Sequence, residues 1–303
     1  MAYQVGALIK DLRLRKGIKQ EELAFGIMDR TALSKVERGL SMPSKTNLDA
    51  LLERLDYTSS LTAEILMTTE EIEIEKLKNE LFVYSTQFRF EEAGELVEKL
   101  ETSKQFQNNK IHQQWLLQLR ISHFLQTGRH SEEVYQLIMK ALELTLPNFS
   151  IHKIKDYLLS RQEICLLIPL SQFHNLNGNV TEAITIHRHL KSFFDEKVVD
   201  VIKKGQLYPQ VLSNLASYLC DIENYEEVLN VTAEGIELCR KTNYFYCLPD
   251  LYWSKTEALF GLGLLTESKE TAKTVYNAYT LFERTYEKEL FKKYAEETLG
   301  VQF

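Results

Sequence analysis

Apolar side chains recur every three or four residues along most of the chain, which is the spacing of helices that bury one face. The first run consists of Val5, Leu8, Ile9 and Leu12. Basic residues and then Gly17 follow it. This order is typical of a helix C-terminus, because cations face the negative end of the helix dipole and glycine adopts left-handed backbone angles. The pattern predicts a first helix that ends near Lys16.

Two short helices are predicted next. Residues 20–25 begin with polar and acidic side chains, which suit the positive end of a helix dipole. A third helix follows, with Asp29 or Thr31 as its N-terminal cap, Leu33 on its buried face and Gly39 at its end. The outer face of this third helix is then polar and basic.

The rest of the chain contains one pattern five times: a helix, a tight polar turn, and a small or apolar anchor residue that opens the next helix. The turns have the sequences FRFEEA, RHSEEV, GNVTEA, ENYEEV and LLTESK. The anchors, 41, 49, 45 and 40 positions apart, are Ala93, Val134, Ala183, Val228 and Ser268. The pattern resembles a divergent tetratricopeptide repeat. It predicts about five helical pairs that stack into a right-handed superhelix with a concave groove.

Two prolines agree with this period. Pro209 and Pro249 lie 40 residues apart. We expect both near the start of the first helix of a pair, because the first turn of a helix tolerates proline.

Composition favours an all-α fold, since 12 glycines and 5 prolines in 303 residues are too few for the turns of a β fold. The longest apolar run, residues 164–170, is far shorter than the roughly 20 residues of a membrane span. The N-terminus does not resemble a secretory signal. Four cysteines without a CxxC pair favour reduced thiols. We therefore expect a cytoplasmic protein without a membrane segment.

Charge is distributed unevenly. Residues 1–66 contain ten Lys or Arg and nine Asp or Glu, a balance of plus one, whereas the remainder has 26 against 34, a balance of minus eight. Only the N-terminal part is therefore suited to a polyanion. Any affinity for DNA must depend on where the basic residues lie and on doubling the module by dimerisation.

The sequence contains no catalytic motif. His187 and His189 are two residues apart on a predicted helix and point to different faces, so they cannot share a metal. A phosphate-binding loop, a dinucleotide-binding glycine motif and a nucleophile elbow are all missing from the sequence. We expect no enzyme activity, no metal and no cofactor.

The three short helices, with the strings QEELA and LSKVERG followed by PS and a leucine-rich stretch, resemble the helix-turn-helix domain of the Cro/C1 type. The resemblance covers residues 1–66 and implies that the third helix enters the DNA major groove. The residues it places at base edges are Arg30, Thr31, Ser34 and Lys35. Those it places at phosphates are Gln20, Arg38, Ser44 and Lys45, the last two near the start of a fourth helix.

The chain as a whole, a DNA-binding head followed by tetratricopeptide-like pairs, is similar to the RRNPP family of Gram-positive quorum-sensing regulators. The resemblance implies a linker helix over residues 67–84 and a body over residues 85–303. In that family the body forms a homodimer and acts as the receptor of a short peptide pheromone that has been secreted, processed and re-imported. Peptide occupancy reorients or re-oligomerises the heads on operator DNA.

The same resemblance implies where the peptide binds. Residues 211–229 align without a gap with the family segment whose asparagine holds the peptide backbone, and the matching residue is Asn214. An amide can both donate to and accept from an extended peptide. The candidate peptide contacts are Asn214, Tyr218, Asp250, Trp253 and Ser254. Asp250 stands where the family pattern has a glutamine, which would favour a basic or N-terminal group on the ligand.

Aromatic residues are frequent over residues 275–299, a predicted terminal helix that forms either core or a dimer surface. Two further functions stay open from the sequence. The groove of a protein-interaction scaffold would bind a folded protein partner. A constitutive repressor would have a vestigial groove and bind DNA without a ligand.

Overall fold

The computed structural model describes residues 2–57, 76–81, 83–84, 90–102, 107, 109–126, 131–197, 199 and 201–303. Within these residues the secondary structure is helical and contains no strand, which confirms the all-α prediction. The chain divides into two compact units, Met1–Leu166 and Leu167–Phe303. The expected boundary at residue 66 and the first part of the expected linker helix, residues 67–75, lie outside the described residues; residues 76–81 and 83–84 are helical.

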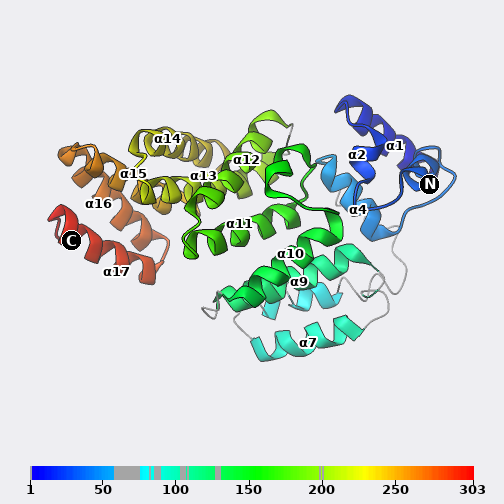
Figure 1. Cartoon of the computed structure of the whole chain (residues 1–303), viewed down its shortest axis with the longest axis horizontal. Helices are drawn as coiled ribbons and strands as arrows, with labels where there is room; N and C mark the ends of the chain where they lie inside the picture. The colour runs from blue at the N-terminus through cyan, green and yellow to red at the C-terminus, as the bar shows by residue number, and fades with distance from the viewer. Residues whose placement is uncertain are drawn as a thin grey trace. The chain divides into compact units, whose positions relative to one another are not determined.

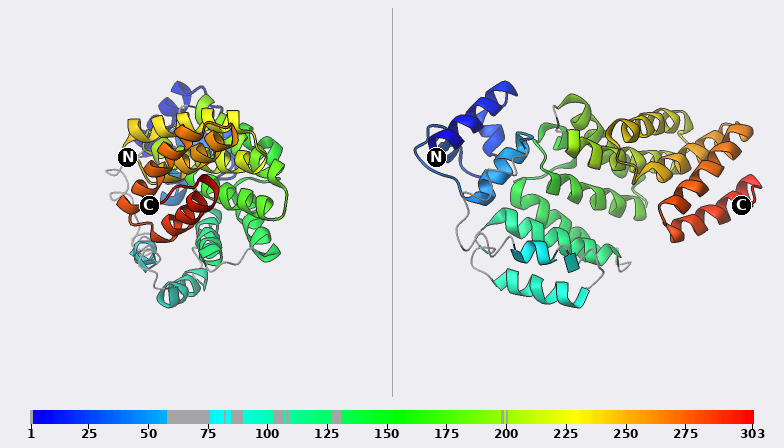
Figure 2. Two further views of the ribbon diagram at one scale, coloured as in Figure 1. Left: turned by 90° about the vertical axis from the view of Figure 1, so that its left-hand side faces the viewer. Right: turned by 180° about the vertical axis from the view of Figure 1, so that it is seen from behind.

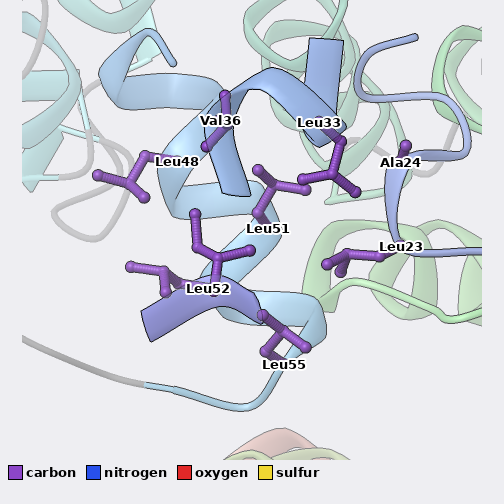
Figure 3. Close-up of a cluster of buried hydrophobic side chains, with 9 residues drawn as sticks. Leu23, Ala24, Leu33, Val36, Leu48, Leu51, Leu52 and Leu55 are labelled. Atoms are coloured by element: carbon purple, nitrogen blue, oxygen red, sulfur yellow. The ribbon is translucent and has the colours of Figure 1, made fainter. Parts of the chain in front are cut away.

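The head consists of α1 (Ala2–Arg15), α2 (Gln20–Ala24), α3 (Arg30–Glu37) and α4 (Lys45–Arg54). Their apolar faces converge on one core, drawn in Figure 3. The buried members of this core are Ile9, Leu23, Ala24, Leu33, Val36, Leu48, Leu51, Leu52 and Leu55. In α1 the predicted inner face is met in part: Ile9 is in this core, Val5 and Leu12 pack against it half-buried, and Leu8 is not a member.

Caps and one buried ion pair fix the ends of the head helices. Asp29 is the N-cap of α3, and its carboxylate accepts a hydrogen bond from the Thr31 amide at 2.7 Å. The structure therefore selects Asp29 from the two predicted caps. Gly39 has a φ of 72°, as expected for the residue that ends this helix. Arg13 donates to Glu37 at 2.6 and 2.9 Å and so ties α1 to α3 inside the head.

The first unit continues with α7 (Phe90–Thr102), α9 (Lys110–Gln126), α10 (Glu132–Thr145) and the 3-10 turn η2 (Ile151–Asp156). Next comes α11 (Arg161–Leu176), which begins in the first unit and ends in the second. Ser160 and Glu163 form a capping box at its start: the Glu163 amide donates to the Ser160 hydroxyl and the Ser160 amide donates to the Glu163 carboxylate.

The second unit consists of α12 (Val180–Glu196), α13 (Val201–Asp221), α14 (Tyr225–Thr242), α15 (Leu248–Gly261), α16 (Leu265–Leu281), α17 (Thr285–Tyr294) and the π-helical turn η3 (Ala295–Leu299). Helices α12 to α17 pack against one another in chain order, as Figure 1 shows and the rear view in Figure 2 repeats. This order of neighbours is that of stacked helical pairs.

A helix begins within each of the five predicted turn sequences, of which residues 88–89 and 129–130 lie outside the described residues. The helices that begin there are α7, α10, α12, α14 and α16. The five anchor residues are all buried, which explains why the repeat has a small or apolar residue at that position. The repeat in the sequence therefore reflects packing: each anchor is the first buried residue of the second helix of a pair.

Two details of the sequence prediction are wrong. Pro249 lies in the first turn of α15 as expected, but Pro209 lies inside α13, because that helix begins eight residues earlier, at Val201. The predicted single terminal helix is two helices, α16 and α17, separated by a turn in which Glu283 has a φ of 56°. In the described part of the chain, no helix has the length and apolar character to cross a membrane.

Candidate functional site

The outward face of α3 is the candidate DNA-reading surface. Leu33 and Val36 turn into the core, which leaves Arg30, Thr31 and Lys35 exposed and Ser34 half-buried. Arg30 lies 3.4 Å from Glu21, but both side chains are about two-thirds exposed, so solvent screens the pair. All four predicted base-reading residues therefore lie on one accessible helix face, with the guanidinium of Arg30 able to leave its partner.

The predicted phosphate contacts are placed less uniformly. Arg38 is exposed, and its Nε donates to the carbonyl of Ser34. Ser44 is exposed and caps α4 by accepting from the Asn47 amide. Gln20 donates to Glu37 at 2.8 Å and thus supports the buried Arg13 pair. Lys45 is buried and forms an ion pair with Asp49.

Lys45 is buried because α4 packs against body helices of the first unit. Thr46 bonds to His112 of α9 at 2.9 Å. Arg54, at the C-terminal end of α4, lies 3.4 Å from Glu163 of α11, and both side chains are almost completely buried. The hydroxyl of Thr145 donates to the same carboxylate at 2.6 Å. The head is thus held to the other helices of the first unit through α4.

Sequence analysis missed this polar contact. The charges of Arg54 and Glu163 gave no signal, since exposed charges are ordinary on helix surfaces and the two residues are 109 positions apart. The string Ser160 to Glu163 does carry the capping-box spacing and could have located the start of α11. Which residue Glu163 binds could be known only from the packing of α4 on α11.

A pocket lies between α13 and α15 in the second unit, with a volume of about 500 Å³. Its α13 wall carries Gln210, Ser213, Asn214, Ser217 and Asp221, and its α15 wall carries Asp250, Trp253, Ser254 and Glu257. Tyr246, Cys247 and Arg284 complete it. Polar residues at three- and four-residue spacing form each wall. Sequence analysis singled out only Asn214 on the α13 wall, although this spacing is visible in the sequence.

Asn214 provides the clearest polar feature of this pocket. Its side-chain nitrogen is buried and has no hydrogen-bond partner among the described residues. A buried donor without an acceptor costs free energy, typically about 1–3 kcal/mol, and is uncommon in folded proteins. The amide therefore points to an acceptor that a ligand would supply.

Asp250 is not a free carboxylate. It accepts from the hydroxyl of Tyr279 and from Nη1 of Arg284, both at 2.7 Å. The expectation that Asp250 attracts a cationic ligand group thus has to account for an arginine already bound to it. The charge of Asp250 also adds to burial in raising the pKa of Tyr279.

The other predicted peptide contacts are divided. Trp253 lines the pocket, donates from Nε1 to Glu257 at 3.0 Å and packs edge-on against Phe291. Ser254 also lines it. Tyr218 is buried outside the pocket lining, with its hydroxyl 3.3 Å from Ser171 and its ring against His187. Burial raises the pKa of Tyr218 to about 12.

The N-terminal segment has known relatives. Residues 9–61 match the helix-turn-helix family. Over 70 residues the chain is 41% identical to the ImmF control region 10 kDa protein of Bacillus phage phi105, a match that covers 22% of this chain and 78% of the phage protein. The chain belongs to the helix-turn-helix family. It is a DNA-binding helix-turn-helix regulator.

Solved structures match the whole chain. Bacillus thuringiensis PlcR in complex with the peptide PapR7 and DNA is 19% identical, over 95% of this chain and 99% of that chain, with a TM-score of 0.59. The apo form of the competence regulator ComR from Streptococcus vestibularis is 17% identical over 98% and 99%, with a TM-score of 0.54. The helix-turn-helix regulator thus has the fold of PlcR and ComR, which are RRNPP peptide-responsive regulators and not enzymes.

Proposed function

We propose that this helix-turn-helix regulator acts in the cytoplasm as a homodimer that binds operator DNA and is switched by a short signalling peptide. The face of α3 with Arg30, Thr31, Ser34 and Lys35 would read bases, and the exposed Arg38 and Ser44 would contact phosphates. Gln20 and Lys45 would join them only on leaving Glu37 and Asp49, to which they are bound in this structure. The peptide would lie in the pocket between α13 and α15. The similarity to PlcR, whose structure contains a peptide and DNA, supports both parts of the proposal.

The observation that carries the peptide proposal is the unpaired amide nitrogen of Asn214 in the pocket wall. An extended peptide offers a backbone carbonyl every few ångströms, and such a carbonyl would satisfy this donor whatever the peptide sequence. Trp253 and Ser254 on the opposite wall would contact peptide side chains. Tyr218 would not contact the peptide directly; its hydrogen bond with Ser171 would hold α13 in position beside α11.

Thermal unfolding of the purified chain with pools of short synthetic peptides tests the proposal. A ligand present at a hundred times its dissociation constant adds about 2.7 kcal/mol to the free energy of unfolding. We expect a peptide-specific rise in Tm and a change in operator affinity or oligomeric state. In Asn214→Ala, peptide affinity should fall by roughly 1–3 kcal/mol, because the peptide carbonyl loses its donor.

The matched control is Ser217→Ala, which removes an exposed hydroxyl from the same wall one turn away. It should lower peptide affinity by less than Asn214→Ala. Operator binding without any peptide response would favour a constitutive repressor. Capture of a folded protein by the same groove, together with indifference to peptides, would favour a scaffold. An Asn214→Ala variant that binds peptide as tightly as the parent would exclude the assigned contact.

A further inference from the structure

The charges around the pocket between α13 and α15 do not balance. Its lining contains three carboxylates, Asp221, Asp250 and Glu257, and one cation, Arg284. Arg284 bonds to Asp250 at 2.7 Å and to Glu287 at 2.8 Å. The guanidinium is thus already shared between two carboxylates and leaves the other two acidic groups of the lining without a counter-charge.

Glu257 is the half-buried member of this uncompensated pair. It accepts hydrogen bonds from Nε1 of Trp253 and from the thiol of Cys220, and among the residues that the structure describes it has no ion pair with a lysine or arginine. Burial, together with the nearby charge of Asp221, raises the pKa of Glu257 above its ordinary value. A carboxylate taken from water without a cation loses hydration energy that two hydrogen bonds from neutral groups only partly restore.

Asp221 is the exposed member, at the C-terminal end of α13. It accepts from the Asn175 amide at 3.2 Å and has no cationic partner in the described part of the chain. Its charge acts on Glu257 across the pocket. A cation between the two carboxylates would relieve their repulsion and supply the missing counter-charge.

Two uncharged features of the pocket also favour a cationic peptide as its ligand. Trp253 is an aromatic residue of the same lining, and aromatic rings attract cations, as the guanidinium of Arg284 over the ring of Tyr246 shows within this lining. On the α13 wall, the buried amide nitrogen of Asn214 lacks an acceptor. The pocket therefore offers a donor for a peptide carbonyl and, seven residues further along the same helix, an acidic position.

We propose that this pocket selects peptides by a cationic group, a lysine or arginine side chain or the N-terminal ammonium, bound between Asp221 and Glu257. The inference rests on the proposed peptide function and specifies its ligand. The acidic contact on α15 then differs from the one predicted from the sequence. Asp250 is paired with Arg284, and the carboxylate without a cationic partner is that of Glu257, seven residues later. Asn214 holds the peptide backbone while the two carboxylates select the charge.

The test uses positional-scanning heptapeptide libraries on the full chain, each with lysine, glutamate or alanine fixed at one position. Every library is made with a free and with an acetylated N-terminus, which separates the ammonium from the side chain as the source of charge. We expect lysine pools, or free N-termini, to bind at least tenfold more tightly than their glutamate or acetylated counterparts. Glu257→Gln and Asp221→Asn should remove most of that preference.

Control variants complete the design. Glu270→Gln, at an exposed position of α16 outside the pocket, should keep the preference. Asp221→Lys should shift the preference toward glutamate pools, and because Asp221 is exposed the lysine does not disturb the packing of the core. Binding that depends on Asn214 but shows no preference for cations would overturn this inference and leave the peptide function standing. If no pool binds, both fail.

Discussion

Burial decides how much an ion pair contributes to the stability of this protein. Arg54 and Glu163 have side chains 2% and 1% exposed, whereas Glu237 and Lys241 form a similar pair with both side chains more than half exposed. The same ion pair at the surface is screened by water, but inside the first unit each partner is needed to offset the lost hydration of the other. Residue type alone does not distinguish these two pairs.

Glu163→Gln should lower the free energy of unfolding by about 3 kcal/mol, because it leaves the buried guanidinium of Arg54 without its counter-charge. Glutamine keeps the shape of the capping-box side chain. Urea unfolding at neutral pH measures the change. The control, Glu237→Gln, should change stability by less than about 1 kcal/mol. Equal effects from the two variants would show that the Arg54 contact does not hold the head.

Arg30→Ala should weaken operator binding by roughly 1–3 kcal/mol, the usual contribution of an arginine to base recognition, while the fold stays intact. Its ion pair with Glu21 is exposed and contributes little to stability. Fluorescence anisotropy with operator and with unrelated DNA measures the loss of specificity. Arg15→Ala, which removes an equally exposed cation from α1, serves as control. Unchanged specificity in Arg30→Ala would remove this residue from the reading face.

At the scale of elements, turns decide how closely helices approach. Gly17 and Gly26 both have left-handed backbone angles, with φ of 67° and 71°. A Cβ on Gly17 would meet open space, but a Cβ on Gly26 would lie 1.7 Å from the carbonyl oxygen of Thr145. The turn after α2 thus packs directly on the end of α10, and glycine is required there for contact as well as for backbone angle.

Gly26→Ala should therefore cost at least about 3 kcal/mol of stability, since backbone strain and a clash with another backbone add together. Gly17→Ala should cost about 1 kcal/mol, from the strain alone. Chemical denaturation of both variants measures the difference. Similar costs at the two positions would mean that the head does not lie against α10 in solution.

At the scale of the whole molecule, charge is separated along the sequence. The first 66 residues have a net charge of plus one and the remainder minus eight, within an overall minus seven. Only a few basic residues of the head therefore attract DNA, and the net negative charge of the rest of the chain repels it. Affinity for operator must come from placed contacts, and it should fall steeply as salt rises.

The slope of log affinity against log salt distinguishes the predicted phosphate contacts. Arg38→Ala should reduce that slope by about 1, because an exposed guanidinium releases one counterion on binding. Lys45→Ala should leave it unchanged as long as the ammonium stays buried beside Asp49. A reduced slope in Lys45→Ala would instead mean that α4 leaves the body helices when the protein binds DNA.

Sequence periodicity predicted the short helices of the head and the starts of the five repeat helices, because these depend on neighbours a few residues away. It did not predict the start of α13 or the break between α16 and α17. Asp29 as a cap and the buried anchors such as Ala183 follow from that local chemistry. Of the five candidate peptide contacts that the family resemblance implied, four line one pocket and Tyr218 does not.

Tertiary structure alone decided which polar groups are free. Asp250 and Glu257 are both acidic residues of α15, yet one is paired with Arg284 and the other is not. Lys45 and Arg38 are both basic residues of the head, yet packing on the body buries only the first. Local sequence cannot distinguish such cases, because the burial of Lys45 and the pairing of Asp250 with Arg284 depend on helices that are brought together only by the tertiary fold.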